Sequence, residues 1–372
     1  MKISISNGVS RRKRADKVFF WTVCFLLLIG FFILASASTG LLVKSEGANF
    51  QDIIFKQIIF GLAGLGLFFL AIKIDYHVWA KLALPIFIFS FFLTLLVIIP
   101  GFGLSHGGAK RWIIFGPISF QPSELLKFGF VLYLAAWIAS RKLYIKKFKT
   151  GFLPFFIMIS AVGALMILEP DIGTLGIIVA SGITLFFIGG GKITHLLIMA
   201  GIIGVIFSIL VYFEPYRLER IMVFINPSYD QQGAGYQLKQ SLIAIGSGGL
   251  FGRGFGTSIQ KFNYLPESVG DSIFAVFGEE FGFAGSLFLL GLFMFFLYKG
   301  FSIARGASDD FGGLLGIGIV ILIVVQSLVN IAAMVGILPL TGLPLIFVSK
   351  GGSALIMALF EAGVLLNISK HA

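Results

Sequence analysis

Long apolar runs alternate with short polar connections along almost the whole chain. The first run, 18–43, holds no charge, and later runs each suit a single helix: 53–72, 82–100, 121–140, 151–168, 172–190, 193–213 and 271–298. A final uncharged run, 311–349, is too long for one helix, and its prolines and glycine divide it into 311–336 and 345–367. Because a spanning helix needs about 20 apolar residues, the pattern predicts an all-α integral membrane protein with ten transmembrane helices.

The composition excludes a water-soluble globular chain and a disordered one. Apolar residues make up 58% of the 372 residues and charged residues 12%, about half the charged share of a soluble domain. In a soluble protein, a net charge of +11 would suggest nucleic-acid binding. In a membrane protein the placement of the charges is more informative than their sum, and we expect no nucleic-acid partner. The single cysteine, Cys24, excludes an intramolecular disulfide.

Basic residues in the connections predict the orientation in the membrane. With the amino terminus inside, the inner segments carry 17 Lys and Arg residues and the outer segments nine. Both termini are then cytoplasmic, and the chain divides into a basic tail, 1–17, and one polytopic membrane domain, 18–370. The Arg-Lys run of the tail is interpreted as a topology signal, with binding to anionic lipid as the alternative.

Two outer segments, 101–120 and 214–270, are long and rich in glycine, proline and paired charges. Long loops are usually functional, so we expect the function to face outward. Within the second segment, 235–245 suits a helix that lies on the membrane or re-enters it. The glycine-rich stretch 248–256, with Arg253 inside it, could approach a phosphate, and a hinge or close packing suits it equally well.

Charged residues at the outer ends of two predicted spans form a first candidate site. Glu124 follows a proline at a helix start, and Lys127 lies three residues later on the same helix face, so the two can pair. A lysine near a helix centre costs about 2.5–3.5 kcal/mol and generally has a partner. Asp171, in the motif 169–174, is expected close enough to balance that lysine. Helix capping is the alternative for Glu124 and Asp171.

A further acid, Asp271, stands at the mouth of the span that follows the long outer loop, where it is either a helix cap or a functional group. Glu279 and Glu280 lie deeper in an apolar run, so at least one is expected to pair or to face a cavity.

The four histidines are dispersed along the sequence, so we expect no site for a soft metal. A hard cation, Mg²⁺ or Mn²⁺, bound together with a diphosphate stays open as a cofactor.

An outward-facing acid beside cations suits transfer of a sugar from a lipid diphosphate. The diphosphate leaves as a stabilised anion, so the reaction needs a carboxylate that takes a proton from the attacking hydroxyl, and cations that stabilise the departing charge. Asp271 is the candidate base. The candidate cations are Lys127, Arg111 and Arg253.

Several motifs, in one order along the chain, resemble the SEDS family of FtsW, RodA and SpoVE: 108–112, 121–124, 169–174, 236–261, 265–267, 278–280, 338–342 and 351–353. The resemblance implies a ten-helix peptidoglycan glycosyltransferase that polymerises lipid II into undecaprenyl-diphosphate-linked glycan outside the bacterial cytoplasmic membrane. It also implies a class B penicillin-binding protein and other division proteins as partners. The stretches 240–249 and 258–267 are more similar to FtsW, the division member, which predicts a septal location; RodA or a sporulation relative is the alternative.

The resemblance also suggests roles for single residues. The essential acid of the family falls on Asp271, and the expected substrate-binding set is Arg111, Trp112, Glu124, Lys127, Asp171, Arg253, Lys261 and Lys350. The chain departs from the family before the acid, where 269–270 read Val-Gly in place of the usual His-Thr, and at Lys350, where tyrosine is usual. We expect Lys350 to compensate for part of this difference.

Two other functions fit the same sequence. A transporter of the lipid-linked precursor should carry charges near the midplane and often has inverted repeats; most acids here lie at outer helix ends and we see no repeat, although Lys56, Glu279 and Glu280 keep this alternative open. A scaffold that only recruits the crosslinking enzyme is the third interpretation, and loss of Asp271 would not disturb it.

Overall fold

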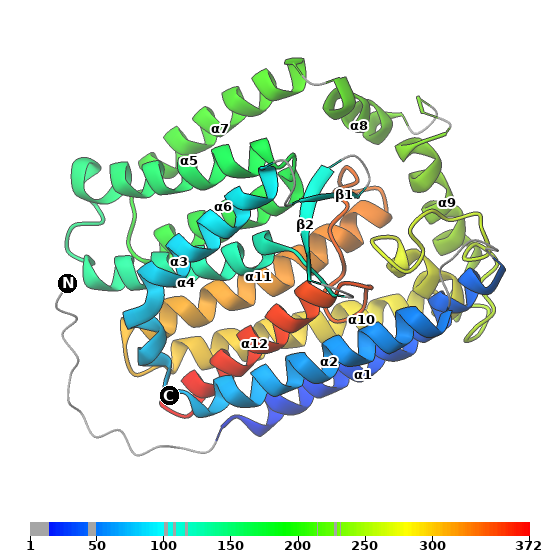
Figure 1. Cartoon of the computed structure of the whole chain (residues 1–372), viewed down its shortest axis with the longest axis horizontal. Coiled ribbons are helices and arrows are strands. Elements are labelled where there is room, and N and C mark those ends of the chain that lie inside the picture. The colour runs from blue at the N-terminus through cyan, green and yellow to red at the C-terminus, as the bar shows by residue number, and fades with distance from the viewer. Residues whose placement is uncertain are drawn as a thin grey trace.

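The protein is a bundle of helices with a small sheet at one end (Figure 1). The computed structural model describes residues 15–43, 50–99, 103–106, 109–115, 118–213, 215–226, 229–230 and 232–372. Its helices are α1 Lys17–Ser38, α2 Phe50–Lys73, α3 Tyr76–Ile98, α4 Pro122–Ser140, α5 Leu153–Leu168, α6 Ile172–Ile188, α7 Ile193–Phe213, α8 Pro215–Ile225, α9 Ala234–Ser247, α10 Ile273–Arg305, α11 Asp310–Met334 and α12 Gly352–Ser369. A 3₁₀ turn, Thr39–Val43, extends α1, and a π-helical turn, Phe148–Phe152, leads into α5.

Most of these helices are of the kind that crosses a membrane. Within the described residues, α1 to α5 and α10 to α12 are long and apolar enough to span a bilayer. α6 and the part Ile193–Ile206 of α7 are shorter apolar segments at two further predicted spans. The chain is therefore a mostly helical multi-pass membrane protein, as predicted. The carboxylate of Asp16, just before α1, forms an ion pair with Lys299 at 3.1 Å. The Asp16 backbone N–H donates to the hydroxyl of Ser369 at the end of α12. The start of α1 and the end of α12 therefore lie on one side of the bundle.

Three helices, α4, α11 and α12, form the centre of the bundle. About four fifths of each spanning window is buried inside the protein, compared with less than a third for α2, α3 and α10. The central helices also pack on the outer ones: α12 lies along α2, α4 along α3, and α11 along α10. The remaining faces expose large apolar side chains such as Phe89 and Leu62, as expected for surfaces that meet lipid.

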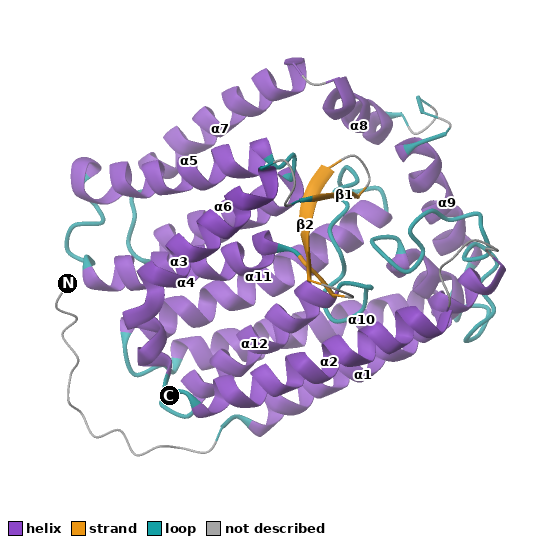
Figure 2. Cartoon of the chain, in the orientation of Figure 1, coloured by secondary structure: helices purple, strands orange, loops and turns teal. Residues whose placement is uncertain are grey.

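The first outer segment contains strands, which the all-α prediction did not include. β1 Leu104–His106, β2 Ala109–Phe115 and β3 Ile118–Phe120 form an antiparallel sheet in the order β1-β2-β3, drawn in orange in Figure 2. Ile113 pairs with Phe120 across the second ladder, and β3 leads directly into α4. The sheet therefore anchors the outer end of α4, which carries Glu124 and Lys127.

The last predicted span begins seven residues too early. The sequence predicts a helix over 345–367, whereas α12 begins at Gly352 and the preceding residues are irregular although buried. Side chains of α11 make this irregular backbone possible, because Gln326 donates to the Pro344 carbonyl and Asn330 donates to the Leu343 carbonyl. Buried carbonyls with such donors do not need helical hydrogen bonds.

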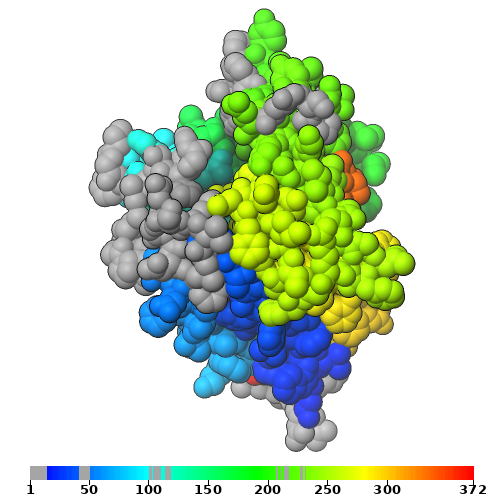
Figure 3. Space-filling view, turned by 90° about the vertical axis from the view of Figure 1, so that its right-hand side faces the viewer, coloured from blue at the N-terminus to red at the C-terminus, as the bar shows by residue number. Residues whose placement is uncertain are grey.

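The second outer segment, 214–270, folds into α8, α9 and a compact loop. The predicted helix over 235–245 is confirmed as α9, which packs against α10. Figure 3 looks onto the end of the bundle from the right-hand side of Figure 1, and the yellow-green part of this segment covers much of that end. The segment is therefore a folded cap on the bundle.

A kink at Gly282 divides α10 into two parts. Its φ of 67° and ψ of −162° lie outside the helical region, in a part of conformational space that is essentially restricted to glycine. A Cβ at this position would come 2.3 Å from the backbone nitrogen of Gly252 and 2.8 Å from the carbonyl of Leu250. The kink therefore lets the glycine-rich loop pack directly against the α10 backbone.

We predict that Gly282→Ala lowers the free energy of unfolding by at least about 2 kcal/mol, because it combines backbone strain with a clash. Gly291→Ala is the matched control, since it lies in the same helix and a Cβ there meets nothing within 4 Å. Denaturant unfolding of both variants in detergent checks this. Equal stability of the two variants would contradict the structural role of the kink.

Candidate active site

Asp271 lies at the end of the turn immediately before α10, where α9 and α11 both reach it. Gln237 of α9 donates from Nε2 to Asp271 Oδ1 at 3.0 Å, and Asn330 of α11 donates to the Asp271 backbone carbonyl at 2.8 Å. The side chain does not cap α10, whose N-cap is Ser272 without a side-chain hydrogen bond. The capping alternative therefore does not describe Asp271, and the residue remains free for chemistry.

The surroundings of Asp271 raise its affinity for a proton. Burial, together with the negative charge of Glu267, raises the pKa of the Asp271 carboxyl to about 6, while the Gln237 hydrogen bond and the positive charge of Arg220 on α8 act in the opposite direction. An acid with a pKa near neutrality is suited to general base catalysis, because it is ionised at pH 7 and still takes a proton readily. Sequence reasoning identified Asp271 but missed Gln237, Arg220 and Asn330.

Glu124 and Lys127 form a buried ion pair on one face of α4, as predicted. Lys127 Nζ lies 2.8 Å from Glu124 Oε2, and both side chains are about 95% buried. Lys127 also donates to Gln326 Oε1 on α11 at 2.5 Å. The pair is therefore fixed between the central helices, and Gln326 was not identified from the sequence.

Glu361 adds a second carboxylate beside this pair. It is the tenth of the 18 residues of α12, is 4% exposed, and is close enough to Lys127 and Glu124 for the charges to interact. The sequence analysis missed it because it is one acid in an otherwise apolar run. Charged groups inside a membrane domain usually mark a functional position, so Glu361 belongs with the candidate site.

Asp171 caps α6, which confirms the capping alternative for this residue. Its Oδ1 accepts from the Thr174 backbone N–H at 3.1 Å, and its Oδ2 accepts from the Thr174 hydroxyl at 2.8 Å. Gln121, the residue before α4, also approaches Oδ2 at 3.4 Å. Asp171 thus ties the start of α6 to the start of α4, and among the described residues it forms no ion pair with Lys127, which pairs with Glu124 instead.

Arg111 and Trp112 both lie on β2. The Arg111 guanidinium donates to the backbone carbonyls of Glu169 and Pro170, in the turn between α5 and α6. Trp112 pairs with Leu104 across the first ladder of the sheet. Arg111 therefore connects the small sheet to the turn that carries Asp171.

Glu169 lies in the same turn and is a buried acid. It is 1% exposed, and among the described residues neither of its carboxyl oxygens has a hydrogen-bond partner. Burial and the nearby charge of Asp171 raise the pKa of the Glu169 carboxyl to about 9, against the opposing effect of Arg111. Glu169 therefore keeps its proton at neutral pH and was not singled out from the sequence.

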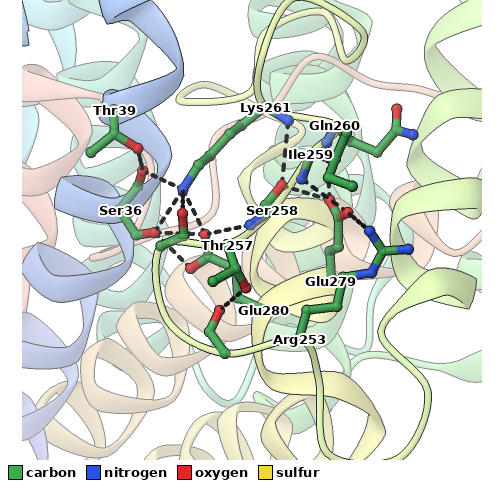
Figure 4. Close-up of polar contacts among 12 residues, drawn as sticks. Ser36, Thr39, Arg253, Thr257, Ser258, Ile259, Gln260, Lys261, Glu279 and Glu280 are labelled. Atoms are coloured by element: carbon green, nitrogen blue, oxygen red, sulfur yellow. Dashed lines mark hydrogen bonds and ion pairs between the residues drawn. The ribbon is translucent and has the colours of Figure 1, made fainter.

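Lys261 and Arg253 lie in a separate polar cluster between the glycine-rich loop, α1 and α10 (Figure 4). The Lys261 amine is fully buried and lies 2.8 Å from Glu280 Oε1, with further hydrogen bonds to Ser36 and to the Gly256 carbonyl. Arg253 is 38% exposed and pairs with Glu279 at 3.4 Å. Glu279 and Glu280 therefore both pair, as expected, and the Lys261 amine is already occupied.

The backbone of Lys350 contacts the segment that precedes Asp271. Its N–H donates to the Val269 carbonyl at 2.8 Å, and its side chain is exposed. The link joins the residues before α12 to those before α10. The structure therefore connects the Lys350 backbone to the segment that leads to Asp271, and the cation whose charge acts on the Asp271 carboxyl is Arg220.

Comparison with known proteins gives one consistent family. The model of the cell cycle protein family FtsW/RodA/SpoVE matches residues 17–372. The chain is 38% identical to stage V sporulation protein E of Bacillus subtilis (strain 168), over 93% of this chain and 94% of that protein. It is 37% identical to the probable peptidoglycan glycosyltransferase FtsW of Geobacter sp. (strain M18), over 95% of this chain and 96% of that protein.

Solved structures agree with this family. A chain from a study of the structural coordination of polymerization and crosslinking by a peptidoglycan synthase complex superposes with a TM-score of 0.79 at 26% identity, over 95% of this chain and 97% of that one. The rod shape determining protein RodA of Thermus thermophilus superposes with a TM-score of 0.70 at 26% identity, over 95% and 96% of the two chains.

We predict that Glu169→Gln stabilises the protein at pH 8. The raised pKa means that the folded state binds one more proton than the unfolded state between about pH 4.5 and 9, so stability falls as the pH rises through this window. Glutamine removes this loss, and the apparent Tm should rise by about 2–4 °C at pH 8 and change little at pH 4.5. Asp310→Asn is the control, because Asp310 is an exposed acid that pairs with Lys142 at the surface and should leave the Tm almost unchanged at both pH values. A Glu169→Gln protein less stable than the parent at pH 8 would contradict a protonated Glu169.

We also predict that Lys261→Met is destabilised by about 3–5 kcal/mol, because it leaves Glu280 buried without its counter-ion. The double variant Lys261→Met/Glu280→Leu should recover part of this loss, and Lys350→Met, which changes an exposed lysine, should have little effect on stability. Unfolding in detergent measures all three. A stable Lys261→Met protein that has lost polymerisation would instead place Lys261 in the substrate site.

Proposed function

Because the chain belongs to the FtsW/RodA/SpoVE family of cell cycle proteins, we propose that it is a peptidoglycan glycosyltransferase that polymerises lipid II at the outer face of the bacterial cytoplasmic membrane. Its similarity to two proteins named probable peptidoglycan glycosyltransferase FtsW, from Geobacter sp. and Geobacter sulfurreducens, supports the activity. The main structural support is the environment of Asp271. This partly buried acid is held by side chains of α9 and α11, and its carboxyl has a pKa of about 6.

The reaction uses Asp271 as general base. Its carboxylate takes the proton from the 4-hydroxyl of the acceptor N-acetylglucosamine, and that oxygen attacks the anomeric carbon of the N-acetylmuramic acid of the growing chain. A glycosidic bond forms with inversion as the bond to the diphosphate breaks. Undecaprenyl diphosphate leaves as an anion and needs no proton from the protein.

Cations near the acid would stabilise the departing diphosphate. Lys350 has an exposed amine and a backbone bond to the segment that carries Asp271, so it is the first candidate for this role. Arg111, Trp112, Glu124, Lys127 and Asp171 stay in the proposed substrate-binding set, because they share the outer ends of α4 and α6 and the adjoining sheet. For Lys261 and Arg253 we propose a structural role instead, since both pair with buried carboxylates of α10.

The finer assignments follow the same reasoning. We place the activity in cell division, at the septum, because 240–249 and 258–267 are more similar to the division member FtsW. A role in sporulation is the alternative, since the chain is 38% identical to a sporulation protein. A class B penicillin-binding protein is the proposed partner, supported by the similarity to a chain of a peptidoglycan synthase complex. A divalent cation bound with the diphosphate can be tested by chelation.

One observation favours a second function, transport of the lipid-linked precursor. Lys127, Gln326 and Glu361 place ionisable and polar groups deep inside the three central helices, which is where transporters bind their cargo. Movement of labelled lipid II across vesicle membranes would separate the two functions. Translocation without glycan synthesis would favour the transporter.

We predict that Asp271→Ala abolishes glycan synthesis, with a loss of at least about 10²–10⁴-fold for a missing general base. In the parent protein the rate should rise with pH through about 6, because the base must be ionised. Glu267→Gln removes a nearby negative charge and should move this rise to lower pH. The assay uses labelled lipid II, the penicillin-binding partner and a divalent cation. Long glycans made by a folded Asp271→Ala protein would overturn the assignment of the base.

A further inference from the structure

The helix α9 presents Gln237 toward Asp271 from a fixed position. Gln237 lies in the first turn of α9, where its backbone N–H donates to the Gly233 carbonyl at 3.1 Å and its own carbonyl accepts from Ser241 at 2.9 Å. The apolar side of this helix is buried, with Leu238 and Ala244 packed in the core, and α9 lies against α10. Gln237 therefore has little freedom to turn away from the acid.

The Gln237 side chain makes two hydrogen bonds from one nitrogen. Nε2 lies 3.0 Å from Asp271 Oδ1 and 2.9 Å from the hydroxyl of Ser272, which is itself fully buried. An amide nitrogen carries two protons, so each can go to one of these acceptors. Ser272 also approaches Asp271 Oδ1, at 3.5 Å.

This arrangement occupies only one of the two carboxylate oxygens. Among the described residues, Asp271 Oδ2 has no hydrogen-bond partner, whereas Oδ1 has Gln237 and Ser272. On the backbone side, Asn330 bridges the carbonyls of Asp271 and Leu343 at 2.8 and 2.7 Å. The acid is thus held from both sides with one oxygen left to accept a proton from a substrate hydroxyl.

The charges around the acid do not all favour its ionised form. Glu267, in the same loop, opposes ionisation, and Arg220 of α8 favours it; Lys350 lies beside the same loop with its amine exposed. A hydrogen-bond donor aimed at a carboxylate favours the charged form. Gln237 is the nearer of two side-chain donors to Asp271 Oδ1, at 3.0 Å compared with 3.5 Å for Ser272, so we expect its loss to change the titration of the acid.

We propose that Gln237 is a positioning residue for the base: it fixes Asp271 Oδ1, directs Oδ2 toward the substrate, and keeps the carboxylate ionised. Ser272 supports Gln237, and Asn330 fixes the backbone of the acid. This inference rests on the proposed function, because it assumes that Asp271 accepts the proton.

The experiment measures lipid II polymerisation from pH 5 to pH 8.5 for Gln237→Leu and for the matched control Gln240→Leu. Gln240 lies three residues further along α9, and its side chain makes no hydrogen bond to the described residues. We expect Gln237→Leu to lower kcat by about 10-fold to 100-fold and to move the acid side of the pH profile upward by about one pH unit. Gln240→Leu should keep the parent profile.

Gln237→Glu is the second variant. It keeps the shape and the polarity of the side chain, so it tests the proposal even where Gln237→Leu does not fold. It places a second carboxylate about 3.0 Å from Asp271, so the acid side of the profile should move further than in Gln237→Leu. A loss of rate in both variants that is equal at every pH would overturn the proposal and leave Gln237 a packing residue.

The proposal and the function on which it rests fail in different ways. If a folded Asp271→Ala protein makes glycan, the base is misassigned and the proposed function falls. If Asp271→Ala is inactive while both Gln237 variants keep the parent pH profile, the base stands and the positioning role of Gln237 is wrong.

Discussion

A lysine inside an apolar bundle must have its charge matched, because an unpaired ion there is far more costly than it is in water. Lys127 meets this requirement with Glu124 on its own helix and Gln326 on α11, and Glu361 brings a second carboxylate from α12. The helices that supply these groups are also the most buried ones. The centre of the bundle is therefore specified by polar contacts as well as by apolar packing, since Lys127 of α4 also donates to Gln326 of α11 and lies near the Glu361 carboxylate of α12.

The same requirement fixes the outer loop to the bundle. Glu280 needs a counter-ion inside the protein, and Lys261 of the loop supplies it while also bonding to Ser36 of α1. Close approach of the loop to α10 is possible because Gly282 leaves room for the backbone of Gly252. With the loop held in this way, α9 packs on α10 and brings Gln237 to Asp271. A cluster for which we propose a structural role thus helps to set the geometry of the acid.

The apolar runs predicted most of the helices, because a membrane requires a long apolar helix for each crossing and few other local signals compete. Features set by contacts between distant segments could not be predicted in this way. The strands after Gly103 are three to seven residues long, the break before Gly352 depends on side chains of α11, and the partner of Lys261 in the loop lies on α10. Glu124 and Lys127 were paired correctly because they are one helical turn apart. Glu361 was missed because its partners lie on α4, far away in the sequence.

Two acids, Glu169 and Asp271, show why burial alone does not make a base. Glu169 is buried and has no hydrogen-bond partner among the described residues, and its pKa rises to about 9, so it stays protonated at neutral pH. Asp271 is also desolvated, but the Gln237 hydrogen bond and the charge of Arg220 limit the rise of its pKa to about 6. A base needs enough burial to take a proton readily and enough stabilisation of its anion to be ionised beforehand. The groups that α8 and α9 direct at Asp271 provide that balance, and the residues around Glu169 do not.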